Sequence, residues 1–175
     1  METNWNIDTT HTDIGFKVKH MMISNVSGSF AKFSSTAQTN GDDFNNAKFE
    51  FSAEIDSIST GMEDRDAHLK SDDFFNAEEF PQLSFKSTSV EVDGDDITVE
   101  GEMTIRDITK PLTLKGEVGG IVTDPYGQVK AGISLNGSIK RSEFGLKWNA
   151  ITEAGSIVVS DTVKLNTELQ FVKQA

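Results

Sequence analysis

Alternation of apolar and polar residues with a period of two is the dominant pattern along this sequence. In residues 48–55, for example, Phe49, Phe51, Ala53 and Ile55 alternate with lysine, glutamate and serine. Such alternation is typical of a β-strand with one buried and one wet face. The pattern recurs in residues 14–20, 83–85, 90–92, 97–105, 112–114, 131–139 and 163–171. Short turn sequences such as 40–43, 93–96 and 124–127 separate these segments, which indicates antiparallel pairing.

One segment, residues 60–71, departs from the alternation and predicts a single short helix. Thr60 and Glu63 have the spacing of a capping box, acidic residues follow, and Lys70 comes late, where the helix dipole favours a cation. A second short turn is predicted at residues 76–79, because the residue before Pro81 is disfavoured in a helical conformation. We expect one all-β domain over residues 1–175 with this one helix.

Eight or so long strands in one domain favour a closed barrel or a sandwich, and only closure removes the exposed sheet edges. An eight-stranded barrel has room for side chains or for one elongated ligand. The chain has 12 phenylalanines against one tyrosine and two tryptophans, mostly on the apolar side of the strands, which favours an apolar guest. Gly28, Gly101 and Gly137 fall on inward positions, where they would leave space or permit a bend. The alternative is that the phenylalanines simply fill a sandwich core.

Composition narrows the classes of partner. With 28 acidic and 16 basic residues the net charge is -12, which argues against nucleic acid and against an anionic membrane surface as partners. The absence of cysteine excludes a disulfide framework and thiolate metal sites. No apolar run approaches the ~20 residues of a membrane helix, so we expect no stable membrane insertion. The start lacks the features of a signal peptide, which predicts a cytoplasmic protein as given, or a periplasmic or secreted one if a leader was removed.

The sequence offers no motif for catalysis. The histidines His11, His20 and His68 lack metal-binding spacing, and neither a GxSxG elbow nor a glycine-rich phosphate loop is present. We therefore predict no metal, no cofactor other than a bound lipid, and no enzymatic activity. One alternative is an enzyme that acts on a lipid or quinone-like substrate, with His20 or His68 as general base.

Four polar residues are candidates for contact with a ligand head group. His20 and Arg141 continue the inward positions of their strands, whereas Arg65 and His68 share one face of the predicted helix with Leu69. Charged groups at such positions need partners, and a head group at a barrel mouth would supply one. The alternatives are that Arg141 pairs with a nearby acid, that His20 is a satisfied core histidine, and that the helix carries only a surface ion pair.

Several motifs, taken in order, resemble one family. The most specific is Arg65-Asp66-x-His68-Leu69-Lys70-Ser71-x-Asp73-Phe74-Phe75; others are Trp5-x-Ile7-Asp8-x-x-His11, Thr109-Lys110-Pro111 and Arg141-Ser142-x-Phe144-Gly145-Leu146. Together they resemble the YceI-like family of lipocalin-like, polyisoprenoid-binding proteins over nearly the whole chain. Asp107 stands where that family has glycine, and aspartate tolerates a left-handed backbone better than most residues.

The resemblance implies an extended eight-stranded antiparallel barrel that holds a long isoprenoid or similar lipid in a central apolar cavity. The implied function is binding, carrying or sequestering such a lipid: a polyisoprenoid, an isoprenoid quinone or a fatty-acid derivative. A ligand-free barrel acting as an acidic interaction module is a further alternative, and dimerisation is compatible with such folds. Combining the resemblance with the inward positions, we expect the apolar bed to consist of Phe16, Val18, Phe30, Phe49, Phe51, Phe85, Met103, Leu114, Ile133 and Leu135, with His20, Arg65, His68 and Arg141 near the head group.

Overall fold

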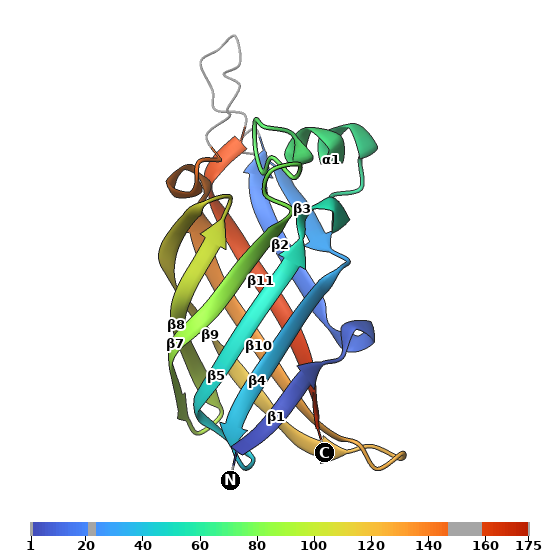
Figure 1. The fold of residues 1–175 in the computed structure, drawn as a ribbon, viewed down its shortest axis with the longest axis vertical. Helices are drawn as coiled ribbons and strands as arrows, with labels where there is room; N and C mark the ends of the chain where they lie inside the picture. The colour runs from blue at the N-terminus through green and yellow to red at the C-terminus, as the bar shows by residue number, and fades with distance from the viewer. Residues whose placement is uncertain (1, 21–23, 147–158, 175) are drawn as a thin grey trace.

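The computed structural model describes residues 2–20, 24–146 and 159–174, which form an antiparallel β-barrel with one α-helix (Figure 1). The helix α1 spans Glu63–Lys70. The strands are β1 (Glu2–Ile7), β2 (Asp13–His20), β3 (Ser24–Phe30), β4 (Phe33–Asn40), β5 (Asp43–Glu54), β6 (Ile58–Ser59), β7 (Gln82–Asp93), β8 (Asp96–Ile105), β9 (Ile108–Thr123), β10 (Val129–Lys140) and β11 (Val159–Lys173). Three short 3₁₀ helices, η1 (Thr9–His11), η2 (Ile55–Ser57) and η3 (Arg141–Phe144), interrupt or follow strands.

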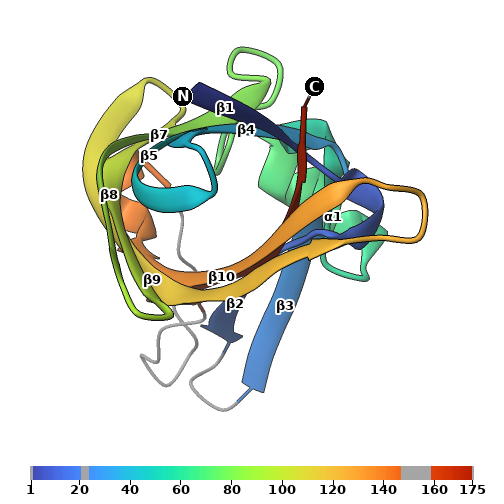
Figure 2. The same cartoon turned by 90° about the horizontal axis from the view of Figure 1, so that it is seen from below.

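The sheet closes on itself. Its order is β1-β4-β5-β7-β8-β9-β10-β11, and β11 pairs back with β1. Beyond that seam β11 pairs with β2, β2 with β3, and β3 with β6. Three pairs of consecutive strands, β1 and β2, β3 and β4, and β5 and β6, each form one long strand with a short interruption. Counted in this way, the barrel has eight long strands, and Figure 2 shows it from one end. The structure therefore confirms the predicted barrel and excludes the sandwich.

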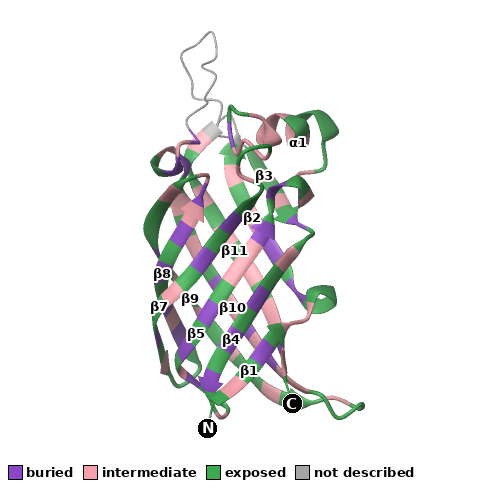
Figure 3. Ribbon diagram, viewed as in Figure 1, coloured by how far each residue is buried: buried purple, intermediate pink, exposed green. Residues whose placement is uncertain are grey.

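The two ends of the barrel differ. Helix α1 and residues 71–81 lie across one end, which we call the helix end (Figure 1). The two chain termini and the β4–β5, β7–β8 and β9–β10 hairpins lie at the other end, which we call the terminus end. Along the strands between them, buried and exposed residues alternate as predicted (Figure 3). No helix within the described ranges is long and apolar enough to span a membrane.

The helix lies where it was predicted, but the predicted capping box is wrong. The residue before the first helical turn is Met62, which makes no side-chain cap. Thr60 instead precedes the helix in extended chain, and both its backbone N and its Oγ1 donate to the Asp66 carboxylate, at 2.8 and 2.5 Å. The helix therefore begins two residues later than a Thr60 cap would allow.

The left-handed residue of the β8–β9 turn also differs from the prediction. Arg106, with φ of 56°, has the positive φ that we expected to be tolerated at Asp107. The expected turn is present, but the unusual backbone conformation falls one residue earlier.

A buried aromatic cluster fills the terminus end. The ring centroids of Trp5 and Phe44 are 5.2 Å apart, those of Phe44 and Phe49 are 6.2 Å apart, and those of Phe49 and Phe171 are 5.8 Å apart. Trp5 and Phe171 are completely buried, and the indole Nε1 of Trp5 donates to Thr39 Oγ1 at 2.8 Å. With its one polar group bonded, the indole packs in the core without an unpaired donor.

An ion cluster holds the interruption between β1 and β2 against the β9–β10 hairpin. Asp8 accepts hydrogen bonds from the Thr10 hydroxyl and backbone N, at 2.7 and 3.1 Å, and its carboxylate lies 2.9 Å from His11 Nδ1. Lys130 Nζ lies 3.7 Å from Asp8 and 3.3 Å from Asp124. The hydrogen bonds from Thr10 and His11 lower the pKa of Asp8 from 3.8 to about 2.

This lowered pKa predicts an acid-dependent loss of stability. Because the folded pKa is below the unfolded one, the Asp8 carboxylate stabilises the fold above about pH 4, and this contribution is lost as the pH falls towards 2. We expect Asp8→Asn to lower the Tm at pH 7 by roughly 2–4 °C for each kcal/mol of unfolding free energy that is lost. Near pH 2 the Tm of the variant should approach that of the wild type. Thermal unfolding followed by circular dichroism from pH 2 to 7 measures both effects.

The matched control is Asp96→Asn, which changes an exposed carboxylate of the β7–β8 hairpin. It should follow the wild-type curve. A Tm difference between Asp8→Asn and wild type that is the same at pH 2 and pH 7 would contradict the assignment.

Candidate functional site

The half of the barrel nearer the helix end encloses an apolar cavity of about 460 Å³. Its walls come from β2, β3, β4, β5, β7, β8, β9, β10 and β11, and α1 with the following residues lines its end. Its lining is dominated by aliphatic and aromatic side chains, with a few polar side chains among them. The phenylalanine-rich inward positions are therefore wall rather than filling in this half of the molecule.

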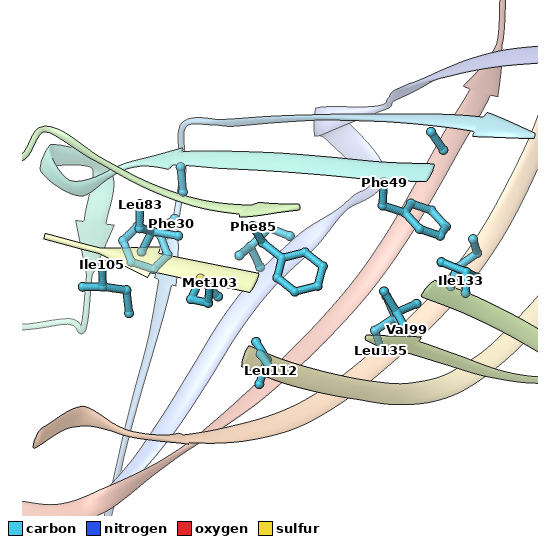
Figure 4. Close-up of a cluster of buried hydrophobic side chains, with 14 of the residues drawn as sticks. Phe30, Phe49, Leu83, Phe85, Val99, Met103, Ile105, Leu112, Ile133 and Leu135 are labelled. Atoms are coloured by element: carbon cyan, nitrogen blue, oxygen red, sulfur yellow. The ribbon is translucent and has the colours of Figure 1, made fainter. Parts of the chain in front are cut away.

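Most of the predicted apolar bed lines this cavity. Nine of the ten residues do so: Phe16, Val18, Phe30, Phe49, Phe51, Phe85, Met103, Leu114 and Leu135. Ile133 does not; it is 2% exposed and packs in the solid core beyond the cavity, because it lies one inward step closer to the terminus end than Leu135. Figure 4 shows Phe49 and Ile133 together at one end of the cluster and Leu83, Phe30 and Ile105 at the other. That these residues bind a ligand stays a prediction.

Several lining residues were not singled out from the sequence. Ile14, Leu83 and Ile105 lie on inward strand positions, so the alternation already contained the signal for them. Phe74 and Phe75 line the cavity from the segment after α1, where no strand periodicity applies. Their position depends on how that segment folds back over the barrel, which only the structure reveals.

Glycines opposite aromatic residues keep the cavity open. Gly28 pairs with Phe16 across β2 and β3, and the Phe16 ring occupies the space that a Cβ at Gly28 would need. The ring of Phe85 likewise lies over Gly101 on the neighbouring strand. Each ring therefore lies along the wall instead of crossing the lumen. This refines the prediction that these glycines leave space, since neighbouring rings take up that space.

Polar side chains gather where the cavity meets α1. Thr60, Asp64, Arg65 and His68 all contribute to its lining there. Arg65 is oriented by Thr60: its Nε donates to Thr60 Oγ1 at 2.7 Å and its Nη2 to the Thr60 carbonyl at 2.6 Å. Neither bond uses Nη1, and within the described part of the chain Nη1 has no hydrogen-bond acceptor. Arg65 is thus a fixed donor at the rim of the cavity.

His68 is also held in place. Its Nε2 lies 2.8 Å from Asp73 Oδ2, and its ring meets the Phe74 ring edge-on with centroids 5.2 Å apart. Arg65, His68 and Leu69 line the cavity, as the predicted helix face requires. The structure therefore brings two of the four predicted head-group residues together on α1.

The other two candidates have different outcomes. Arg141 is 5% exposed and lines the cavity, but its Nε donates to the Ser160 carbonyl at 3.0 Å and its Nη1 to the Leu146 carbonyl at 2.6 Å. Burial lowers the pKa of Arg141, an effect that the carboxylate of Asp161 opposes. Arg141 thus holds the chain around η3. The side chain of His20 lies outside the described residues.

Arg106 links residues 71–81 to the β8–β9 turn and to Gly145. Arg106 Nη1 donates to the carbonyls of Phe74 and Gly145, at 3.3 and 3.5 Å, and Nη2 donates to Asp72 Oδ1 at 3.3 Å. The guanidinium carbon also lies 5.6 Å from the centroid of the Phe80 ring. Each of these contacts is long, so Arg106 contributes several weak interactions. They act beside shorter backbone hydrogen bonds, from Phe75 N to the Leu69 carbonyl at 3.0 Å and from Ile55 N to the Pro81 carbonyl at 2.9 Å.

We expect Arg106→Gln to loosen this segment without unfolding the barrel. The amides of residues 74–80 should exchange with solvent about tenfold faster, because loss of the charged hydrogen bonds removes roughly 1.4 kcal/mol of local stability. Hydrogen–deuterium exchange read by mass spectrometry measures this directly. Lys110→Gln, which removes an exposed cation close to the same turn, should leave the exchange unchanged. Equal exchange in all three proteins would show that Arg106 does not hold the segment.

No group of three or more His, Cys, Asp or Glu side chains with the arrangement of a metal site occurs in residues 2–20, 24–146 and 159–174.

Comparison with known proteins assigns the chain to a family. A family model described as a YceI-like domain matches residues 5–171. A UPF0312 protein of Staphylococcus aureus is 34% identical over 170 residues, which cover 97% of each chain. Among solved structures, a Campylobacter jejuni YceI protein is 34% identical with a TM-score of 0.77, covering 96% of each chain.

A polyisoprenoid-binding domain from Saccharophagus degradans superimposes with a TM-score of 0.70 at 16% identity, covering 97% of this chain and 98% of that domain. At that identity the likeness shows the fold alone, and it agrees with the closed barrel described above. The match over residues 5–171, together with the Staphylococcus aureus and Campylobacter jejuni relatives, shows that this chain belongs to the YceI-like family.

Proposed function

We propose that this protein binds one long-chain apolar lipid inside its barrel and carries or sequesters it. The observation that carries the proposal is the cavity of about 460 Å³ inside the barrel, with an almost entirely apolar wall. That volume falls within the range of sites that enclose small organic ligands. Polyisoprenoids, isoprenoid quinones and fatty-acid derivatives have the shape and polarity that such a wall accepts.

Apolar burial is sufficient to make such binding favourable. Each buried methylene contributes about 0.8 kcal/mol, so a chain of ~20 carbons gains roughly 16 kcal/mol before the costs of ordering it. Tight binding then requires no strong polar contact, and selectivity comes from the shape and length of the cavity. The Saccharophagus degradans domain, which is described as polyisoprenoid-binding, supports the choice of ligand class.

A head group would lie at the rim, next to α1. Arg65 is positioned there by Thr60 and keeps Nη1 for an acceptor oxygen such as a hydroxyl, carbonyl or carboxylate. The chain would extend from that point along the barrel axis towards Phe49, so the ligand lies with its polar group at the helix end.

Binding rather than turnover fits the site best. A cavity is present, which speaks against a filled barrel acting only through its surface. His68, the candidate general base, is hydrogen-bonded to Asp73 and packed against Phe74 at the rim, outside the apolar bed where most of the ligand would lie. Among the described residues that line the cavity, the ionisable groups are Asp64, Arg65 and His68 at the rim and Arg141.

The cavity assignment is tested by placing the same charge on the two faces of one strand. Phe51 lines the cavity and Ser52, its neighbour on β5, lies on the outer face and contacts Ser34. Phe51→Asp buries an unpaired carboxylate in the apolar wall and should weaken retention of geranylgeraniol by at least about a hundredfold. Ser52→Asp should retain it as the wild type does. Native mass spectrometry of the loaded proteins measures the bound fraction, and equal retention in the two variants would overturn the assignment.

The volume of the cavity is tested through a glycine. In Gly28→Ala the three atoms nearest to the new methyl group all belong to the Phe16 ring, which must therefore move towards the lumen. We expect the affinity for geranylgeraniol to fall by at least about fivefold while the barrel stays folded. Gly132→Ala adds the same group on β10 where no other atom lies within 4 Å, and it should bind like the wild type. If both variants bind equally well, the space beside Gly28 does not govern the cavity.

A further inference from the structure

We infer that Phe49 forms a rigid floor to the cavity and, together with Arg65 at the rim, sets the length of chain that the barrel accepts. This inference rests on the proposed function and adds to it a residue that determines specificity. It would make the protein selective for chain length rather than for lipids in general.

The cavity ends at one level on several strands at once. On β8, β10 and β11 one inward residue lines the cavity, and the next inward residue towards the terminus end does not and is at most 2% exposed. These pairs are Val99 and Ile97, Leu135 and Ile133, and Leu169 and Phe171. A boundary shared by three strands is a transverse floor and not a local narrowing. Phe49 on β5 lines the cavity and also packs against Phe44 and Phe171 of the solid core. Figure 4 shows it beside Ile133, at the end of the cluster away from Leu83 and Ile105.

The floor is firmly supported from below. The Phe49 ring stacks on Phe44 at 6.2 Å and packs against Phe171 at 5.8 Å. Behind them Trp5 packs on Phe44, bonds to Thr39 and carries the Lys173 ammonium 5.5 Å from its ring centroid. Close-packed interiors of this kind do not make room for extra methylenes without strain. A chain cannot push past Phe49 into the terminus end.

The other limit of the cavity is polar. Arg65 is fixed by two hydrogen bonds to Thr60, so its Nη1 stands at a set distance from the floor. A chain shorter than this distance leaves part of the wall unfilled. A longer chain must give up its contact with Arg65, coil within the lumen or expose methylenes at the helix end. Affinity should therefore rise with chain length to an optimum and then fall.

The experiment presents an equimolar series of all-trans prenyl alcohols, from farnesol upwards, to the protein and reads the bound fractions by native mass spectrometry. Wild type should show one preferred length. Phe49→Ala opens the floor by about the bulk of one isoprene unit and should move the optimum to longer chains by at least that unit. Leu169→Phe adds bulk just above the floor and should move it to shorter chains.

Phe51→Ala is the matched control, because it removes the same ring from the same face of β5 but from the side wall. It should weaken binding across the series without moving the optimum. The inference is overturned if Phe49→Ala and Leu169→Phe keep the wild-type optimum in folded protein, or if Phe51→Ala moves it as far as Phe49→Ala does. Absence of binding at every length in wild type would instead overturn the proposed function.

Discussion

The pairing of β11 with both β1 and β2 is the constraint on which the rest of the structure depends. The β1–β11 ladder runs over Trp5, Asn6 and Ile7, and beyond the interruption at η1 the pairing passes to β2. This short seam closes the sheet, so no strand edge is left open between β1 and β11. The buried indole of Trp5 lies at the seam, and the Asp8 ion cluster holds the interruption beside it. Closure there turns a curved sheet into a wall around a cavity.

Within that wall the interior is divided. The terminus end is packed solid with interlocking aromatic rings, which supplies the core that a barrel of this size needs in order to fold. The helix end is hollow, because glycines let phenylalanine rings lie along the wall and because α1 and the segment held by Arg106 cover the lumen without filling it. Stability and ligand capacity are thus located in different halves of one barrel, and Phe49 marks the boundary between them.

Much of this could be predicted from the sequence, because a period of two identifies strands and their inward faces together. Nine of the ten predicted wall residues line the cavity, and all of these but Phe30 lie in the alternating segments; the motif containing Arg65 and His68 contributes both to the rim. Depth along the barrel axis could not be predicted, since it depends on strand register, and so Ile133 was assigned to a cavity that ends one step above it. The roles of Arg106 and Arg141 depend on contacts across loops, which local sequence does not encode. The capping box failed for a local reason: Thr60 donates to Asp66 and accepts from Arg65, and this fixes it before the helix begins.

The central claim is that the hollow half of the barrel holds a long apolar chain, and the most direct measurement is native mass spectrometry of the full chain purified without added lipid. Organic extraction of the same sample identifies whatever is bound. The account predicts one stoichiometric apolar adduct per barrel that is released by denaturation. A mass equal to that of the bare chain, unchanged after incubation with isoprenoid quinones and fatty acids, would contradict it.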